Sequence, residues 1–308
     1  MQMPPLPRVD EERAREVAGV VRRLGLRRDS YDDPRFYPPR STPRELQLGY
    51  FAAMVAVDHR TTTPLTRFEG VFDGERLHGA DALYRLGRRL FDEDPEFFTP
   101  ERLASMGVDE GRRLFEIGGV RVWDFYTRVF LLRDLGCKTL ELYGSFENLF
   151  SSDRASEIVA RLRVFRAYED PVEKKAMLLL KFLDGRGLVR VVDRDRLDVP
   201  VDNHLTRIAI RLGVVRLSSE ELLVKQVEVG PEVDRAIREA VKKAWRLVAR
   251  YSGVDVFTLD DYLWSFGRRA CLRGSSPRCG HCPFAEVCLA RARGVFLDEH
   301  RFTLTWYY

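Results

Sequence analysis

Four of the five cysteines of this chain fall in "CLRGSSPRCGHCPFAEVC", residues 271–288. The four thiols follow the spacing C-x7-C-x2-C-x5-C and belong to Cys271, Cys279, Cys282 and Cys288. Zinc sites usually combine two short cysteine pairs, whereas this stretch holds one short pair flanked by two longer steps. Four thiolates in one compact loop are typical of a [4Fe–4S] cluster, so we expect such a cluster within residues 268–294. A structural zinc and unligated cysteines are the alternatives.

The composition is that of a globular protein outside the membrane. Of the 308 residues, 45% are hydrophobic and 32% are charged, the net charge is +4 and the pI is about 8.8. No apolar run is long enough to span a bilayer and the N-terminus has no signal core, so we expect a cytoplasmic, non-membrane protein. We also expect a monomer. In a reducing compartment, clustered cysteines favour metal over disulfides. The slight basic excess permits a phosphate-bearing partner without requiring one. The isolated Cys137 is expected to be a small buried residue.

Apolar residues recur at intervals of three and four along most of the chain, which predicts a mainly α fold. An Asp-Gly turn within residues 68–79 predicts one small β-hairpin. We expect helices over residues 8–26, 80–91, 99–116, 120–135, 153–166, 171–184, 201–213, 231–252 and 259–271.

The stretch "DVPVDNHLTRIAIRLGVV", residues 198–215, carries the main catalytic candidate. Pro200 precedes a helix, and Asp202 lies where the positive end of the helix dipole favours a carboxylate. A plain N-cap is the alternative role for this residue.

The cysteine loop resembles that of the endonuclease III and adenine-glycosylase branch of the helix–hairpin–helix DNA glycosylase superfamily, which carries C-x6-C-x2-C-x5-C. "VDNHLTR" likewise resembles the V-D-T-H-x-x-R stretch that holds the catalytic aspartate of those enzymes. By this resemblance Asp202 stabilises the sugar cation as the base leaves, and His204 and Arg207 have structural roles. The resemblance also implies that the cluster is structural and that basic residues beside it, Arg273 and Arg278 among them, meet nucleic acid.

Members of that superfamily that cleave DNA strands place a lysine in L-P-G-V-G-x-K-T-A, and "EDPVEKKAMLLL", residues 169–180, falls on this stretch with Lys174 at the lysine. The glycines that bring backbone N–H groups to a DNA phosphate are absent here. Lys174 precedes Asp202 by 28 residues, a longer gap than in those enzymes. The resemblance therefore implies a glycosylase without a standard DNA-gripping hairpin, with Lys174 as a second catalytic candidate.

Other stretches are similar to the queuosine-salvage nucleotide N-glycosylases, which share the glycosylase fold and lack those glycines. They are "YGSFENLF" (143–150), "LDDYLWSFGRR" (259–269) and "HRFTLTWYY" (300–308). In this comparison Asp202 is again the catalytic aspartate and Lys174 is a pocket lysine. The cysteine loop is not a feature of that family.

We therefore expect two helical lobes, a central one over residues 44–196 and a second formed by 1–43 plus 197–308 that carries the cluster loop. The leading hypothesis is an N-glycosylase that releases a damaged or modified base from DNA, with a queuosine-type nucleotide N-glycosidase and a non-catalytic nucleic-acid-binding module as alternatives. Further candidates for contact with the base or nucleic acid are Asp58, His59 and Arg60, together with Tyr262 and Trp264. Weaker aromatic candidates are Tyr50, Phe51, Phe266 and Trp306.

Overall fold

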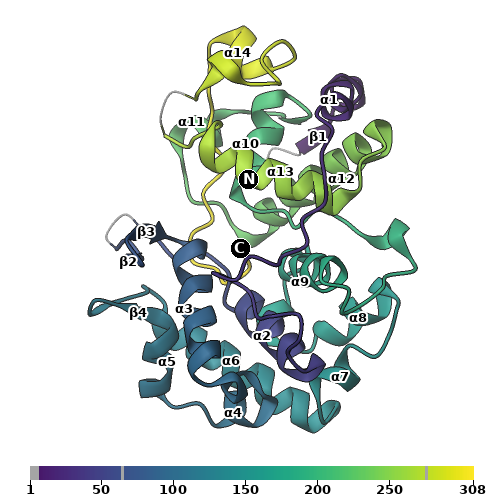
Figure 1. The fold of residues 1–308 in the computed structure, drawn as a ribbon. Coiled ribbons are helices and arrows are strands. Elements are labelled where there is room, and N and C mark those ends of the chain that lie inside the picture. Colours follow the sequence, from purple (N-terminus) through teal and green to yellow (C-terminus); the bar gives the residue numbers. More distant parts are fainter. Residues whose placement is uncertain (1–6, 64–65, 275–276) are drawn as a thin grey trace. The chain divides into compact units, whose positions relative to one another are not determined.

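A computed structural model describes residues 7–63, 66–274 and 277–308 (Figure 1). The fold is mainly helical, which confirms the expected class. The chain divides into two compact units, Met1–Asp29 with Leu197–Thr305, and Ser30–Arg196 with Trp306–Tyr308. Segment 30–43 lies with the second unit because the buried Arg186 guanidinium donates to the carbonyls of Tyr31 and Pro38 at 3.2 and 2.9 Å.

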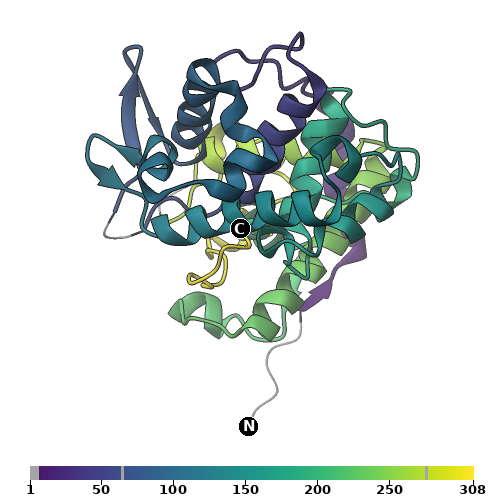
Figure 2. The same cartoon turned by 90° about the horizontal axis from the view of Figure 1, so that it is seen from below.

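The first unit surrounds one apolar core. Its elements are β1 (Pro7–Val9), α1 (Glu11–Arg23), α10 (Asn203–Leu212), β6 (Val215–Leu217), α11 (Glu221–Lys225), α12 (Pro231–Ser252), α13 (Val256–Arg269), the 3-10 turn η4 (Cys279–His281) and α14 (Leu289–Arg293). The antiparallel pair of β1 and β6 joins the N-terminal segment to the stretch after α10 (Figures 1 and 2). Leu205, Ile208 and Leu212 of α10 pack in the core with Trp245 of α12 and Phe284 of the cysteine loop. Both ends of α10 are thus held within a continuous core.

The second unit contains the central part of the chain. Its elements are α2 (Arg44–Ala56), β2 (Glu69–Phe72), β3 (Glu75–His78), α3 (Ala80–Glu93), η1 (Pro95–Phe98), α4 (Pro100–Ser105), α5 (Val108–Phe115), β4 (Glu116–Ile117), β5 (Val120–Arg121), α6 (Phe125–Leu142), α7 (Phe146–Leu149), α8 (Ala155–Leu162), η2 (Arg166–Tyr168), α9 (Lys174–Gly185) and η3 (Arg194–Arg196). Helix α2 is buried along almost its whole length. Its C-terminal turn therefore sits on a rigid element.

Several expected elements differ in the structure. The expected helix 99–116 is two helices, because the chain turns at Met106 and Gly107 caps α5 through its N–H bond to Glu110 Oε2 at 2.9 Å. Residues 120–121 form β5 rather than a helix start, since Gly118 and Gly119 adopt positive φ values of 56° and 82° in a tight turn. The expected hairpin β2–β3 is confirmed. The described residues also form a second hairpin, β4–β5, and a long-range antiparallel pair, β1–β6, so the expectation of a single hairpin was wrong.

Cys137 is exposed on α6, so the expectation that it is buried was wrong. Its helix position faces away from the buried side that Leu135 and Gly136 occupy. Among the described residues, no helix combines the length and apolar character needed to cross a membrane.

Candidate functional site

Asp202 is the N-cap of α10. Its Oδ1 accepts from the Leu205 backbone N–H at 2.9 Å, and its carbonyl oxygen accepts from the Thr206 N–H and hydroxyl at 3.0 and 2.8 Å. Oδ2 accepts no hydrogen bond from the described residues, and the residue is part exposed. One oxygen is thus fixed by the helix end while the other remains available.

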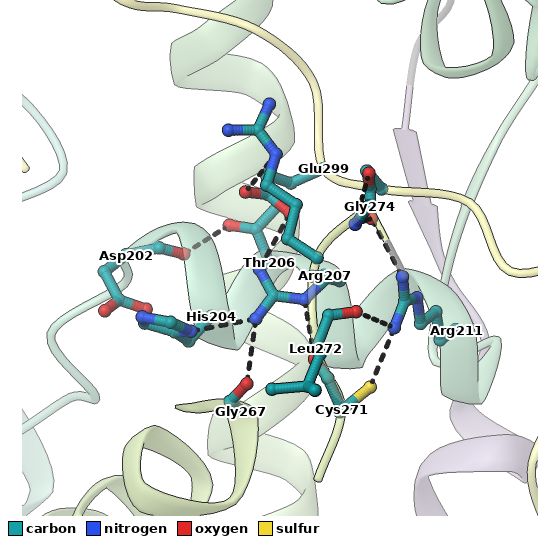
Figure 3. A network of polar contacts seen from close by, with 12 residues as sticks. Asp202, His204, Thr206, Arg207, Arg211, Gly267, Cys271, Leu272, Gly274 and Glu299 are labelled. Atoms are coloured by element: carbon teal, nitrogen blue, oxygen red, sulfur yellow. Dashed lines mark hydrogen bonds and ion pairs between the residues drawn. The ribbon is translucent and has the colours of Figure 1, made fainter. Parts of the chain in front are cut away.

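Arg207 holds the helix beneath this carboxylate (Figure 3). Its fully buried guanidinium donates to His204 Nδ1 at 2.8 Å, to the Gly267 carbonyl at 3.1 Å, to the Cys271 carbonyl at 2.8 Å and to Glu299 Oε2 at 2.9 Å. Burial, with the Arg207 charge, lowers the pKa of His204. Because arginine only donates, Nδ1 of the neutral imidazole accepts and its proton lies on Nε2.

Arg211, one turn further along α10, binds the start of the cysteine loop. It donates to the Leu272 carbonyl at 2.9 Å, to Cys271 Sγ at 3.3 Å, to the Leu297 carbonyl at 2.8 Å and to Asp298 Oδ1 at 2.8 Å. The two arginines therefore connect the helix that begins at Asp202 with the first cysteine of the loop (Figure 3).

The four cysteines of the loop line a single pocket. The other residues that line it are Ile208, Arg211, Leu212, Phe266, Ala270, Pro277, Arg278, Phe284 and Phe296. Burial, together with the three neighbouring cysteines, raises the pKa of the Cys282 thiol to about 11. Burial likewise raises the pKa of Cys288. Within residues 7–63, 66–274 and 277–308, no three His, Cys, Asp or Glu side chains converge as a ready-made metal site.

The loop before α9 keeps the shape of a tight turn without glycine. Glu173 adopts the left-handed conformation, with φ of 66°, and immediately precedes Lys174, the first residue of α9. Asp170 accepts from the backbone N–H groups of Val172 and Lys174 at 3.0 and 2.9 Å. A carboxylate of the chain itself therefore occupies N–H groups that a glycine-rich hairpin would offer to a phosphate.

The side chain of Lys174 donates to the Asp58 carbonyl at 2.9 Å, at the C-terminal turn of α2. Next to it, the fully buried Lys175 donates to the Ala56 carbonyl at 2.6 Å and lies 3.2 Å from His59 Nδ1. His59 Nε2 contacts Asp124 Oδ2 at 2.5 Å. Burial lowers the pKa of both His59 and Lys175 well below the ordinary values. His59 thus has both ring nitrogens engaged inside the unit.

The other predicted contact residues are in varied surroundings. Tyr262 stacks on Phe266, and burial raises its pKa to about 12. Trp264 lies under the Arg268 guanidinium, 4.3 Å from the ring centroid. Asp58 accepts from the Tyr84 hydroxyl at 3.4 Å and Arg60 is part exposed, while Arg273 and Arg278 are exposed on the cysteine loop.

The weaker aromatic candidates are engaged in packing. Tyr50 and Phe51 are fully buried in α2, where their side chains fill the core of the second unit, which is the alternative role to a place beside the base. Phe266 packs against Phe284, and the Trp306 indole donates to the Arg166 carbonyl at 3.0 Å.

Sequence reasoning missed the acidic partners of the two α10 arginines. Asp298 is 87 residues from Arg211 and Glu299 is 92 residues from Arg207, and nothing in their spacing predicts a contact. The one available signal was the pair of arginines at positions i and i+4 on an otherwise apolar helix face. Such a pair needs buried carboxylates or carbonyls as partners.

Comparisons with known proteins point in one direction. A family model described as "AGOG: N-glycosylase/DNA lyase" matches residues 184–288, a segment that contains Asp202 and all four cysteines but not Lys174. Curated relatives include "DNA glycosylase/AP lyase ROS1", 31% identical over 126 residues, and "DEMETER-like protein 2", 30% identical over 122 residues, both from Arabidopsis thaliana. The matches cover 38% and 37% of this chain, which spans 8% and 9% of those proteins.

A solved structure shares the fold. It is that of the 8-oxoguanosine-complexed Pa-AGOG, 8-oxoguanine DNA glycosylase from Pyrobaculum aerophilum, with a TM-score of 0.52 and 17% sequence identity. The alignment covers 90% of this chain and 96% of that one. The likeness extends over both units of the present chain.

Proposed function

We propose that this chain, which belongs to the helix–hairpin–helix DNA glycosylase superfamily, is an N-glycosylase that releases a damaged or modified base from DNA. The observation that carries the proposal is the carboxylate of Asp202, with Oδ1 fixed by the cap of α10 and Oδ2 available. It lies in the segment that the glycosylase family model matches.

Cleavage of the N-glycosidic bond is favoured by one fixed negative charge near the sugar. When the bond between C1′ and the base nitrogen breaks, its electron pair leaves with the base and positive charge develops on the sugar ring. A preorganised carboxylate stabilises that cation more than it stabilises the neutral substrate. Water then bonds to C1′ and its released proton neutralises the departed base. Asp202 would supply this charge, with the base turned out of its stack so that its sugar reaches the carboxylate.

We further propose that the four loop cysteines hold a [4Fe–4S] cluster. They line one pocket whose other lining residues are apolar apart from Arg211 and Arg278, and Arg211 donates to Cys271 Sγ. Buried thiols with raised pKa values favour the protonated form, whereas iron binds thiolates, so the cluster would reverse the local preference. When bound, the cluster would supply a rigid covalent link between distant turns of the loop rather than a reacting group.

A strand-cleaving lyase step is a second candidate. The family description and the name of ROS1 both include lyase activity, and Lys174 is placed at the start of α9 with its amine at the Asp58 carbonyl. In that step the lysine amine would bond to C1′ as the bond to the base breaks, and the base would take up the proton. The C1′–O4′ bond would then open to give the imine, and loss of a proton from C2′ would expel the 3′ phosphate and cleave the strand.

The proposal is tested with a panel of duplex oligonucleotides, each with one modified base, 8-oxoguanine included, and with the free queuosine nucleotide. Base release from an oligonucleotide that Asp202→Asn abolishes is expected. Base release from the free nucleotide alone would instead support a queuosine-type nucleotide N-glycosidase. DNA binding without base release from any substrate would support a non-catalytic binding module. Iron and sulfide analysis of anaerobically purified protein checks the cluster, and stoichiometric zinc would refute it.

A further inference from the structure

Three consecutive residues near the C-terminus bind α10, the cysteine loop and α12 of the first unit. Asp298 accepts from Arg211 of α10 at 2.8 Å and from the Gly274 N–H of the cysteine loop at 3.2 Å or less. Glu299 accepts from Arg207 at 2.9 Å. His300 Nε2 contacts Asp234 of α12 at 2.8 Å. We call residues 298–300 the C-terminal strap.

The strap reaches the residue before Asp202 by a second route. Asp234, held by His300, lies 3.7 Å from the Arg238 guanidinium, and Arg238 donates to the Val201 carbonyl at 3.2 Å. His300, Asp234 and Arg238 are almost completely buried. Both the backbone entering Asp202 and the helix leaving it are therefore tied to the same short segment.

Glu299 is the centre of this arrangement. Its side chain and that of Arg207 are each 2% exposed, so the ion pair is shielded from water and its geometry is strongly constrained. Through Arg207, Glu299 also acts on His204, on the Gly267 carbonyl of α13 and on the Cys271 carbonyl (Figure 3). A shift of Glu299 would move the cap of α10 and the first cysteine together.

We infer that the C-terminal strap, through Glu299, is a positioning device that sets the Asp202 cap and couples it to the cysteine loop. The inference rests on the proposed function, in which Asp202 is catalytic. None of the three strap residues touches the substrate in this scheme; they act through Arg207, Arg211 and Arg238.

The test compares Glu299→Gln with the full-length wild type on the duplex oligonucleotide that releases its base. The rate constant of a single turnover is expected to fall, up to about 100-fold, because a small displacement of a catalytic group is enough for such a loss. The amplitude is expected to stay unchanged. The single turnovers use saturating enzyme, because Glu299 Oε1 also lies 3.5 Å from Nε of Arg273, a candidate DNA contact, and the loss of this ion pair would alter the Kd for DNA. A role in folding alone would lower the amplitude and leave the rate constant as in the wild type, which would overturn the inference.

Two further variants sharpen the comparison. Glu299→Asp keeps the charge but shortens the side chain by one methylene, so a smaller but measurable fall in the rate is expected. Glu228→Gln is the matched control, because Glu228 accepts from the Thr303 hydroxyl at 2.5 Å further along the same segment but does not contact Arg207. It is expected to leave the rate unchanged, and an equal loss in this control would contradict the inference.

Hydrogen exchange gives a readout that does not depend on activity. The Leu205 amide donates to Asp202 Oδ1, so its exchange is expected to accelerate in Glu299→Gln and not in Glu228→Gln. If no substrate loses its base but this exchange pattern appears, the strap holds the cap and the proposed function fails. If the wild type is active and Leu205 exchanges alike in all variants, the inference fails and the function stands. Should Glu299→Gln not fold, Glu299→Asp carries the same two measurements, and wild-type values in both would overturn the inference.

Discussion

Replacing Lys175 by Met tests whether a buried amine beside the candidate Lys174 is uncharged in the folded protein. Lys175 is completely buried, with the Ala56 carbonyl and His59 as its polar partners. Burial lowers its pKa well below the ordinary value, and the charges of Lys174 and Arg128 lower it further. Methionine preserves the length of the side chain and removes the titrating group.

The sign follows from proton linkage. In the unfolded chain a lysine has a pKa of about 10.4, so between the folded pKa and that value the unfolded state binds the additional proton. The free energy of unfolding therefore rises with pH in this window, by about 1.4 kcal/mol per pH unit for one proton. At pH values below the folded-state pKa of Lys175, its contribution to the free energy of unfolding no longer changes with pH. In Lys175→Met this slope is absent, so wild type gains stability relative to the variant as the pH rises through this window, by up to about 1.4 kcal/mol per pH unit.

The absolute stability of the variant is a poor test, because two effects oppose each other. Loss of a buried amine removes a desolvation cost, but it leaves the Ala56 carbonyl and His59 Nδ1 without their donor, which costs about 1–3 kcal/mol. The difference between wild type and variant in the pH dependence of the free energy of unfolding contains neither of these two effects.

Urea unfolding of the full chain at several values from pH 8 to pH 9 measures this slope. Leu179→Met is the control, since Leu179 is also fully buried in α9 and carries no titratable group. Its stability is expected to run parallel to that of the wild type. Parallel curves for Lys175→Met as well would show that Lys175 is protonated in the folded state and would refute the reasoning.

Three further results are expected. Asp202→Ala loses the cap bond to Leu205 and should lower the free energy of unfolding by about 1 kcal/mol, whereas Asp202→Asn, which can still cap, should lose only a few tenths; equal losses in urea unfolding would contradict the cap. Gly267→Ala would place a Cβ 2.8 Å from the His204 Cβ, so a loss of about 1–3 kcal/mol is expected in the same assay, and an unchanged midpoint would contradict this close packing. Lys174→Gln should abolish any borohydride-trapped DNA adduct while base release persists, and trapping by the variant would assign the lyase step to another amine.

Much of the candidate site could be predicted from local sequence. Asp202 precedes an apolar helix pattern and follows Pro200, so its place at a helix start is a local property, and the structure has it as the N-cap of α10. The β2–β3 hairpin was predictable for the same reason, because an Asp-Gly turn selects that geometry within a few residues. The superfamily resemblance, read from the cysteine loop and "VDNHLTR", is confirmed by the comparisons.

The partners of those residues could not be predicted, because they are distant in sequence. Glu299 is 92 residues from Arg207, and periodicity contains no information about which buried charge will meet which. The loop before α9 shows a related limit. The missing glycines predicted a hairpin that does not grip a DNA phosphate, but they did not predict the shape of the turn. Glu173 adopts the left-handed conformation and Asp170 accepts from the N–H groups of Val172 and Lys174. The left-handed conformation of a residue other than glycine costs roughly 1–2 kcal/mol, and tertiary and side-chain contacts offset this cost. The local sequence pattern does not reveal those contacts.

The buried arginines change how the basic composition should be understood. Arg128, Arg207 and Arg238 are each at most 1% exposed, and each donates to a backbone carbonyl, that of Arg60, Gly267 and Val201 respectively. A guanidinium offers five donors in a plane, so one such side chain can satisfy several carbonyls that no helix or sheet would pair. These charges belong to the interior and are unavailable to a phosphate. The DNA contact in the proposed function must therefore come from exposed residues such as Arg273 and Arg278. Substitution of these two residues, with the buried arginines left intact, is expected to weaken DNA binding.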